Sequence, residues 1–63
     1  MNPMAHTEQI LKLRHDLSNP LSALLAEAQL LLLNGDKVDP ETLTSIREIE
    51  ALAVRMRNIL REV

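Results

Sequence analysis

The stretch LLLNGDKVDPE, residues 31–41, decides the fold because it breaks a leucine-rich run with turn residues and then restarts a helix. Asn34 and Gly35 both tolerate the left-handed backbone conformation that closes many helices. We therefore expect a first helix to end at Leu33 and a loop to follow over about residues 34–39.

The residues after this loop predict the start of a second helix. The Asp39 carboxylate can accept hydrogen bonds from the free amides of a first helical turn, and Pro40 suits that turn because its missing N–H is not needed there. Glu41 places a negative charge near the positive end of the helix dipole. We expect this helix to cover about residues 40–63.

The first helix has two candidate starts. Asn2 followed by Pro3 supplies a capping side chain and a proline at a first helical position, and Thr7 with Glu8 offers a later start. We expect this helix to cover about residues 3–33.

Apolar residues recur at helical spacing in both halves of the chain. The second helix carries them three and four apart, as in a heptad seam: Ile46, Ile49, Ala53, Met56, Leu60 and Val63. The first helix carries several such rows: Ile10, Leu17, Leu24 and Leu31; Leu21 and Ala28; Leu11, Leu25 and Leu32. One antiparallel neighbour cannot cover so many rows. We therefore expect an all-α, antiparallel helical hairpin that homodimerises into a four-helix bundle.

The composition supports self-association. A chain of 63 residues is marginal at burying a core on its own, and without cysteine it has neither a disulfide nor a thiolate metal site to hold it together. The absence of aromatic residues and the formal net charge of −2 argue against a nucleic-acid partner.

The chain also lacks the pattern of a membrane protein. The run over residues 24–33 contains Glu27 and Gln29 and is shorter than the roughly 20 apolar residues that a spanning helix needs. Residues 1–9 do not form a signal peptide, because no basic region is followed by an apolar one. We expect a soluble, cytoplasmic segment without membrane contact.

Polar side chains interrupt the leucine pattern in LRHDLSNPL, residues 13–21. On a helix, His15 shares one face with Lys12, Asn19 and Ser22 and should point at water. An apolar stripe should point toward a core: Leu13, Leu17, Leu21 and Leu24. Pro20 lacks the N–H that would bond the carbonyl of Asp16, so we expect a kink one turn past the histidine.

At these residues the chain resembles a known family. The segment HDLSNPL, residues 15–21, with Leu13 before it and Leu24 after it, resembles the H-box of two-component sensor histidine kinases, in their dimerisation and histidine-phosphotransfer (HisKA-type) domain. The H-box has an acidic residue directly after the histidine, Asn or Thr four positions after it, then proline and leucine, and all of these are present. Ser18 stands where basic residues are frequent in the family.

The resemblance implies a role for each of these residues. His15 would accept the γ-phosphoryl group of ATP through Nε2, with Asp16 orienting the ring and acting as a base. Asn19 holds the position that, in family members with phosphatase activity, helps to place a water against the phosphoaspartate of the regulator. Small residues would leave room for a docking partner helix: Ser18, Ser22, Ala23 and Ala26.

The resemblance also implies the partners of the chain. The phosphoryl group would pass to an aspartate in the receiver domain of a response regulator. The chain has no glycine-rich phosphate cradle, so we expect no cofactor bound by this segment, and ATP with Mg²⁺ would arrive on a separate catalytic domain. Residues 61–63 carry no helix stop signal, so we expect a fragment of a longer kinase that is inactive alone.

Two other interpretations stay open. A dimeric histidine phosphotransferase would receive its phosphoryl group from a regulator and never use ATP. A structural or RNA-binding hairpin would only dimerise, and the lack of a basic stripe weighs against RNA.

The remaining polar and sulfur-containing residues receive ordinary structural interpretations. We interpret His6 as a solvated side chain and Met56 as core filling. His6 and His15 are nine residues apart, which does not match the spacing of helical metal ligands, so no metal site is expected. The arginines are expected to form a solvated face with neighbouring glutamates: Arg14, Arg47, Arg55, Arg57 and Arg61.

Overall fold

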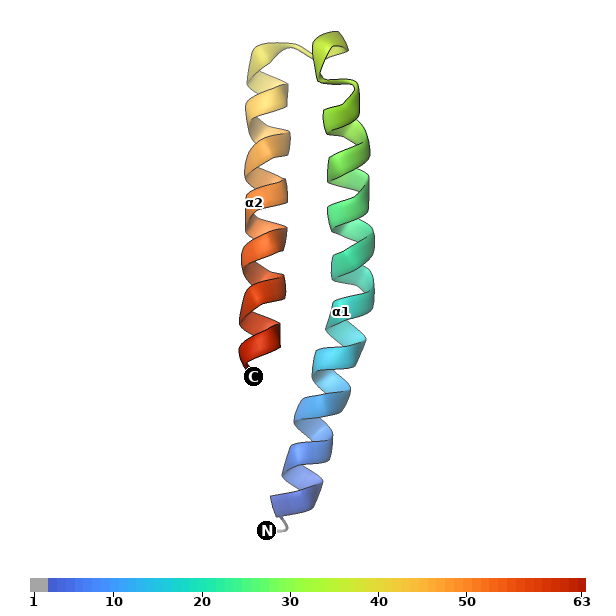
Figure 1. Cartoon of the computed structure of the whole chain (residues 1–63), viewed down its shortest axis with the longest axis vertical. Coiled ribbons are helices and arrows are strands. Elements are labelled where there is room, and N and C mark those ends of the chain that lie inside the picture. Colours follow the sequence, from blue (N-terminus) through green and yellow to red (C-terminus); the bar gives the residue numbers. More distant parts are fainter. Residues whose placement is uncertain (1–2) are drawn as a thin grey trace.

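The computed structural model describes residues 3–63, with side chains from residue 6 onward, as two helices packed side by side. Helix α1 covers Pro3–Leu33, a short 3₁₀ turn η1 covers Gly35–Lys37, and helix α2 covers Pro40–Glu62. The helices run antiparallel, and α1 extends beyond the end of α2 (Figure 1). The expected all-α hairpin is confirmed, and the described residues contain no strand. The expected cap at Asn2 lies outside the described residues.

The start of α2 is built as its sequence predicts. Asp39 is the N-cap residue, and one of its carboxylate oxygens accepts a hydrogen bond from the Thr42 N–H at 3.1 Å. The other oxygen accepts from the Thr42 hydroxyl at 2.7 Å. The hydroxyl and amide of Thr42 lower the pKa of the Asp39 carboxyl, so the cap stays ionised at neutral pH. Pro40 occupies the first turn.

The end of α1 differs from the expected left-handed closure. No residue in the described part of the chain has a positive φ, and Asn34 has φ −107° and ψ 28°. The chain leaves the helix through a 3₁₀ turn, in which Lys37 N–H donates to Asn34 C=O at 3.0 Å and Val38 N–H donates to Gly35 C=O at 3.3 Å. The expectation of a left-handed closure is wrong, because the Asn34 N–H donates to the Leu31 carbonyl at 3.2 Å and the chain passes straight from the last helical turn into this 3₁₀ turn.

Gly35 instead allows a close approach of the turn to α2. A Cβ atom added at this position would lie 3.1 Å from Leu43 Cδ1, which is closer than ordinary van der Waals contact. The glycine therefore lets the loop pack directly on the first turns of α2.

The two helices meet along a single row from each, which we call the hairpin seam. Its buried residues are Leu21, Leu25 and Ala28 of α1 and Ile46 and Ala53 of α2. Half-buried residues continue the same rows: Arg14, Ser18 and Leu32 of α1, and Leu43, Glu50, Arg57 and Leu60 of α2. These positions are three and four apart, so each row stays on one face of its helix.

Other residues expected in the core lie outside this seam. Leu13, Leu17 and Leu24 are 59%, 44% and 49% exposed, and Ile49 and Met56 are 45% and 50% exposed. Within the single chain these side chains face outward, and the four-helix bundle expected to cover them stays a prediction. An α-helix advances about 100° per residue, so these rows lie roughly a quarter to a third of a turn away from the seam.

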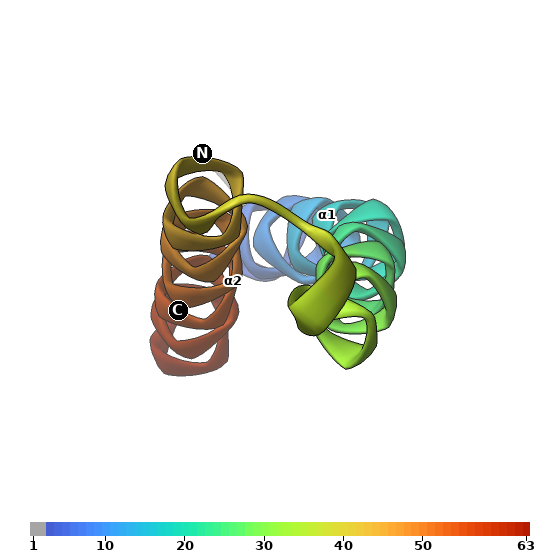
Figure 2. The same cartoon turned by 90° about the horizontal axis from the view of Figure 1, so that it is seen from above.

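These exposed residues form a second row on each helix, which we call the outer apolar face. It consists of Ile10, Leu13, Leu17, Leu24 and Leu31 of α1 and Ile49, Leu52, Met56, Ile59 and Val63 of α2. A hollow lined by Leu17, Leu24 and Met56 together with Pro20 and Leu21 joins the two rows, so both lie on the same side of the hairpin. Seen from above, the described helices form a single pair whose flanks carry no third element (Figure 2).

The seam tolerates little extra volume at Ala53, which is only 1% exposed. We expect Ala53→Leu to lower the free energy of unfolding by about 1–3 kcal/mol, because the added atoms must displace Leu21 or Leu25. The matched control is Ala51→Leu, because Ala51 is exposed on the same helix and its substitution should stay within about 0.5 kcal/mol. Urea unfolding at one fixed protein concentration measures both variants, and equal midpoints would contradict this packing.

Candidate functional site

His15 lies on the exposed surface of α1, next to Arg14, which contacts the end of α2. Its side chain is 76% exposed, as the polar face of the sequence predicts. The imidazole is therefore accessible to a reagent or a partner in the single chain.

Asp16 interacts with two neighbours through its two carboxylate oxygens. Oδ2 accepts a hydrogen bond from Lys12 Nζ at 2.7 Å, one helical turn away. Oδ1 lies 3.7 Å from His15 Nδ1, which is longer than the 2.7–3.2 Å of a protein hydrogen bond. In this structure the firm partner of Asp16 is Lys12, a residue whose role the sequence analysis did not identify.

The Lys12–Asp16 pair keeps both groups charged. The hydrogen bond from Lys12, with its positive charge, lowers the pKa of the Asp16 carboxyl below its ordinary value. The same contact raises the pKa of Lys12. Both side chains are well exposed, so the pair contributes to local electrostatics and little to the stability of the fold.

Arg14, next to His15 in sequence, points to the other side of α1. It is half-buried, and its Nη1 donates to the Val63 carbonyl at 3.3 Å, which links α1 to the end of α2. Its expected place on a solvated arginine face is therefore wrong. Arg57 is also half-buried, and its Nε is buried without a hydrogen-bond partner among the described residues.

The small residues expected to receive a partner do not all lie on one face. Asn19, Ser22, Ala23 and Ala26 are exposed. Ser18 is half-buried in the hairpin seam, and its hydroxyl donates to the Arg14 carbonyl at 2.7 Å. The exposed strip is thus corrected to exclude Ser18, and it continues toward the loop as a hollow lined by Ala26, Gln29, Leu30 and Leu33.

Pro20 interrupts the hydrogen bonding of α1 without ending the helix, which is continuous over Pro3–Leu33. Figure 1 shows α1 changing direction along its cyan segment, N-terminal to Pro20. The proline ring lines the hollow on the outer apolar face, so it lies on a different side of α1 from His15. A bend at this point tilts the histidine-bearing part of α1 relative to the rest.

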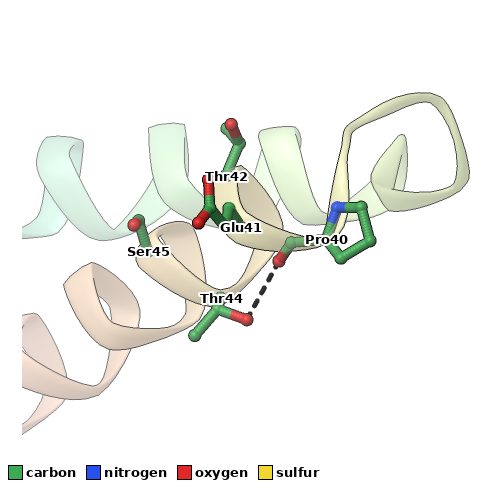
Figure 3. A pocket seen from close by; sticks show the side chains of 5 residues that line it. All are labelled: Pro40, Glu41, Thr42, Thr44 and Ser45. Carbon is green, nitrogen blue, oxygen red and sulfur yellow. Dashed lines mark hydrogen bonds between the residues drawn. The ribbon is translucent and has the colours of Figure 1, made fainter.

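A third hollow lies at the opposite end of the hairpin, at the start of α2 (Figure 3). It is lined by Pro40, Glu41, Thr42, Thr44 and Ser45. The Thr44 hydroxyl donates to the Pro40 carbonyl at 2.9 Å, and the Thr42 hydroxyl donates to Asp39, so both are used within the helix start. This hollow is remote from His15 and adds nothing to its chemistry.

Among the described residues, neither α1 nor α2 holds a stretch apolar enough to cross a lipid bilayer. Over the same part of the chain, no three histidine, cysteine or carboxylate side chains come together as metal ligands. Comparisons with protein-family models, with curated proteins and with solved structures found no match to the chain.

The Lys12–Asp16 contact can be tested by titration. We expect Lys12→Met to raise the pKa of Asp16 toward its ordinary value of 3.8, because the hydrogen bond that favours the carboxylate is lost. Lys37→Met removes the same charge from the loop and should leave Asp16 unchanged. Carboxyl carbon chemical shifts followed against pH measure both variants, and equal Asp16 titrations would show that the pair does not form in solution.

Proposed function

We propose that the chain is the dimerisation and phosphoacceptor segment of a sensor histidine kinase. The observation that carries the proposal is the position of His15, which stands exposed beside an ionised carboxylate on a helix whose sequence at 15–21 resembles an H-box. An exposed imidazole with a carboxylate near Nδ1 can act as a nucleophile through Nε2, provided that the proton resides on Nδ1.

The proposed reaction is transfer of the γ-phosphoryl group of ATP to His15. The Nε2 lone pair attacks the γ-phosphorus, an N–P bond forms, and the bond from phosphorus to the bridging oxygen breaks, so that ADP leaves with the electron pair. Asp16 accepts the hydrogen bond, and then the proton, from Nδ1 of the positively charged ring. Positioning and charge stabilisation dominate such transfers, so a separate catalytic domain would supply the ATP and Mg²⁺.

We further propose that two copies of the hairpin pair through their outer apolar faces into a four-helix bundle. The chain exposes 5215 Å², whereas a compact protein of 7.1 kDa exposes about 4,100 Å². The excess of roughly 1,100 Å² is comparable with the 800 Å² or so that each partner buries in a standard interface. The radius of gyration is 15.7 Å, whereas a compact chain of this length would have about 11 Å, so the single chain is more extended than a compact domain.

A second copy is the occupant that fits this face best. The outer apolar face repeats three and four residues apart along α2. On α1 it continues from Leu17 at seven-residue intervals, with Pro20 and Glu27 between the leucines, and both spacings are those of helix bundles, so an identical face can pack on it about a two-fold axis. In that arrangement His15, on another side of α1, stays exposed. The exposed strip of Asn19, Ser22, Ala23 and Ala26 would then remain open to the receiver domain of a response regulator, and Asn19 would serve its phosphatase chemistry.

Phosphorylation tests the proposed chemistry. We expect the chain, incubated with radiolabelled Mg-ATP and a panel of histidine kinase catalytic domains, to acquire acid-labile, base-stable label. The His15→Gln variant should lose the label to background, whereas His6→Gln, which removes the other histidine, should keep it.

Two outcomes would contradict this assignment. Label that comes only from a phosphorylated receiver domain, and never from ATP, would favour the histidine phosphotransferase interpretation. Label that persists in the His15→Gln variant would remove His15 from the chemistry.

A pair of matched variants tests the dimer. Leu52 on the outer apolar face and Leu30 on the far side of α1 are 57% and 55% exposed in the single chain. We expect Leu52→Asp to weaken dimerisation at least about thirtyfold, because it buries an unpaired charge in the interface, while Leu30→Asp leaves dimerisation unchanged. Sedimentation equilibrium measures both, and a wild-type chain that sediments as a folded monomer would overturn the four-helix bundle.

A further inference from the structure

The site contains one charged residue that the proposed reaction does not use. Lys12 lies one turn before Asp16 on the exposed surface of α1 and holds Asp16 Oδ2 at 2.7 Å. The oxygen that faces the ring, Oδ1, is 3.7 Å from His15 Nδ1. The carboxylate is thus engaged by the ammonium group and falls short of the imidazole.

We propose that Lys12 is a positioning residue that keeps the Asp16 carboxylate away from His15 until the Lys12 ammonium group binds another anion. While the ammonium group holds the carboxylate, Nδ1 has no carboxylate oxygen at hydrogen-bond distance. When a phosphoryl group arrives at the ring, its negative charge competes for Lys12, and the released Asp16 can close on Nδ1. The role in phosphoryl transfer rests on the proposed function, but the withholding itself is a property of the three side chains.

The consequence for the ring is a change of tautomer. A neutral imidazole carries its proton on either nitrogen, and a hydrogen bond from Nδ1–H to a carboxylate favours the form whose Nε2 lone pair is free. Withholding Asp16 therefore keeps His15 a poor Nε2 nucleophile at rest. When Asp16 is released and bonds Nδ1–H, the Nε2 lone pair is free to attack.

The physical weakness of the Lys12–Asp16 pair suits this role. The two side chains are 78% and 53% exposed, so water and salt screen their attraction and little free energy holds them together. A multiply charged phosphate group attracts an ammonium group more strongly than one carboxylate does. A buried pair would hold Asp16 too firmly to release it.

The other charged groups near His15 do not perform the same task. Arg14 points toward α2 and donates to the Val63 carbonyl. The last turn of α2 contributes Arg61 and Glu62, both exposed. Among the described residues, the ion pair at this site is Lys12 with Asp16, and the Asp16 carboxylate lies 3.7 Å from His15 Nδ1.

The experiment measures the His15 tautomer from its ring ¹⁵N chemical shifts, in the 63-residue chain, at alkaline pH. We expect Lys12→Met to raise the ratio of the Nδ1–H to the Nε2–H form severalfold. Lys37→Met should match the wild type, and Lys12→Arg should restore the wild-type ratio. His6 provides an internal reference in every spectrum.

The double variant Lys12→Met with Asp16→Asn separates withholding from simple charge effects. We expect it to lose the rise in the Nδ1–H form, because the carboxylate that would close on the ring is gone. A rise that persists in this background, or a Lys12→Met spectrum equal to that of Lys37→Met, would overturn the proposal.

Pyrophosphate serves as the anion probe in the wild-type chain. We expect it to shift the His15 tautomers toward those of Lys12→Met by more than sodium chloride does at equal ionic strength, and equal shifts would contradict release by a phosphate group. No kinase is present in these measurements, so their outcome is independent of whether His15 accepts phosphate from ATP.

Discussion

The structure depends on a mismatch between the number of apolar rows on each helix and the number of neighbours within one chain. An α-helix can turn only about a third of its surface toward a single partner, and the hairpin seam uses that third. Leu21, Leu25 and Ala28 meet Ile46 and Ala53 there. The outer apolar face is left over on both helices, on the same side of the hairpin. Two long helices that lie side by side without a further layer give the molecule its long, narrow shape of 54 × 14 × 12 Å between Cα atoms.

The local signals in the sequence determine much of this fold because they act over one or two turns. Asp39 and Pro40 predict the start of α2 correctly, since a capping carboxylate and a proline at the first turn depend only on the adjacent backbone. The turn forms at Gly35 as the sequence predicts, but the physical reason for a glycine at this position was not predictable. Its proximity to Leu43 depends on how the second helix packs, and a residue type alone does not reveal that contact.

The choice of seam could not be read from the sequence for a related reason. Leucine occupies so many positions of α1 that several phases of the helix satisfy a three-and-four pattern equally well. The observed phase brings Ala28 and Ala53, which are 4% and 1% exposed, into the seam. Small residues let two helices approach closely, and the larger leucines then fit beside the contact. The exposure of His15 was predictable because it shares a polar face with Lys12 and Asn19, and none of these leucine rows runs along that face. The contact of Asp16 with Lys12, in contrast, depends on rotamers.

The seam also changes character along its length, and this bears on the histidine. Near the loop it is apolar, but at the level of His15 it contains Arg14, Ser18 and Arg57, and the buried Arg57 Nε finds no partner among the described residues. Such a group costs about 1–3 kcal/mol, so the two helices hold each other less firmly at this end. The outer apolar face, by contrast, continues past this level to Leu13 and Ile10. In the proposed dimer, the firm support of the histidine-bearing part of α1 therefore comes from the second copy, and pairing of the chains and presentation of His15 become one structural event.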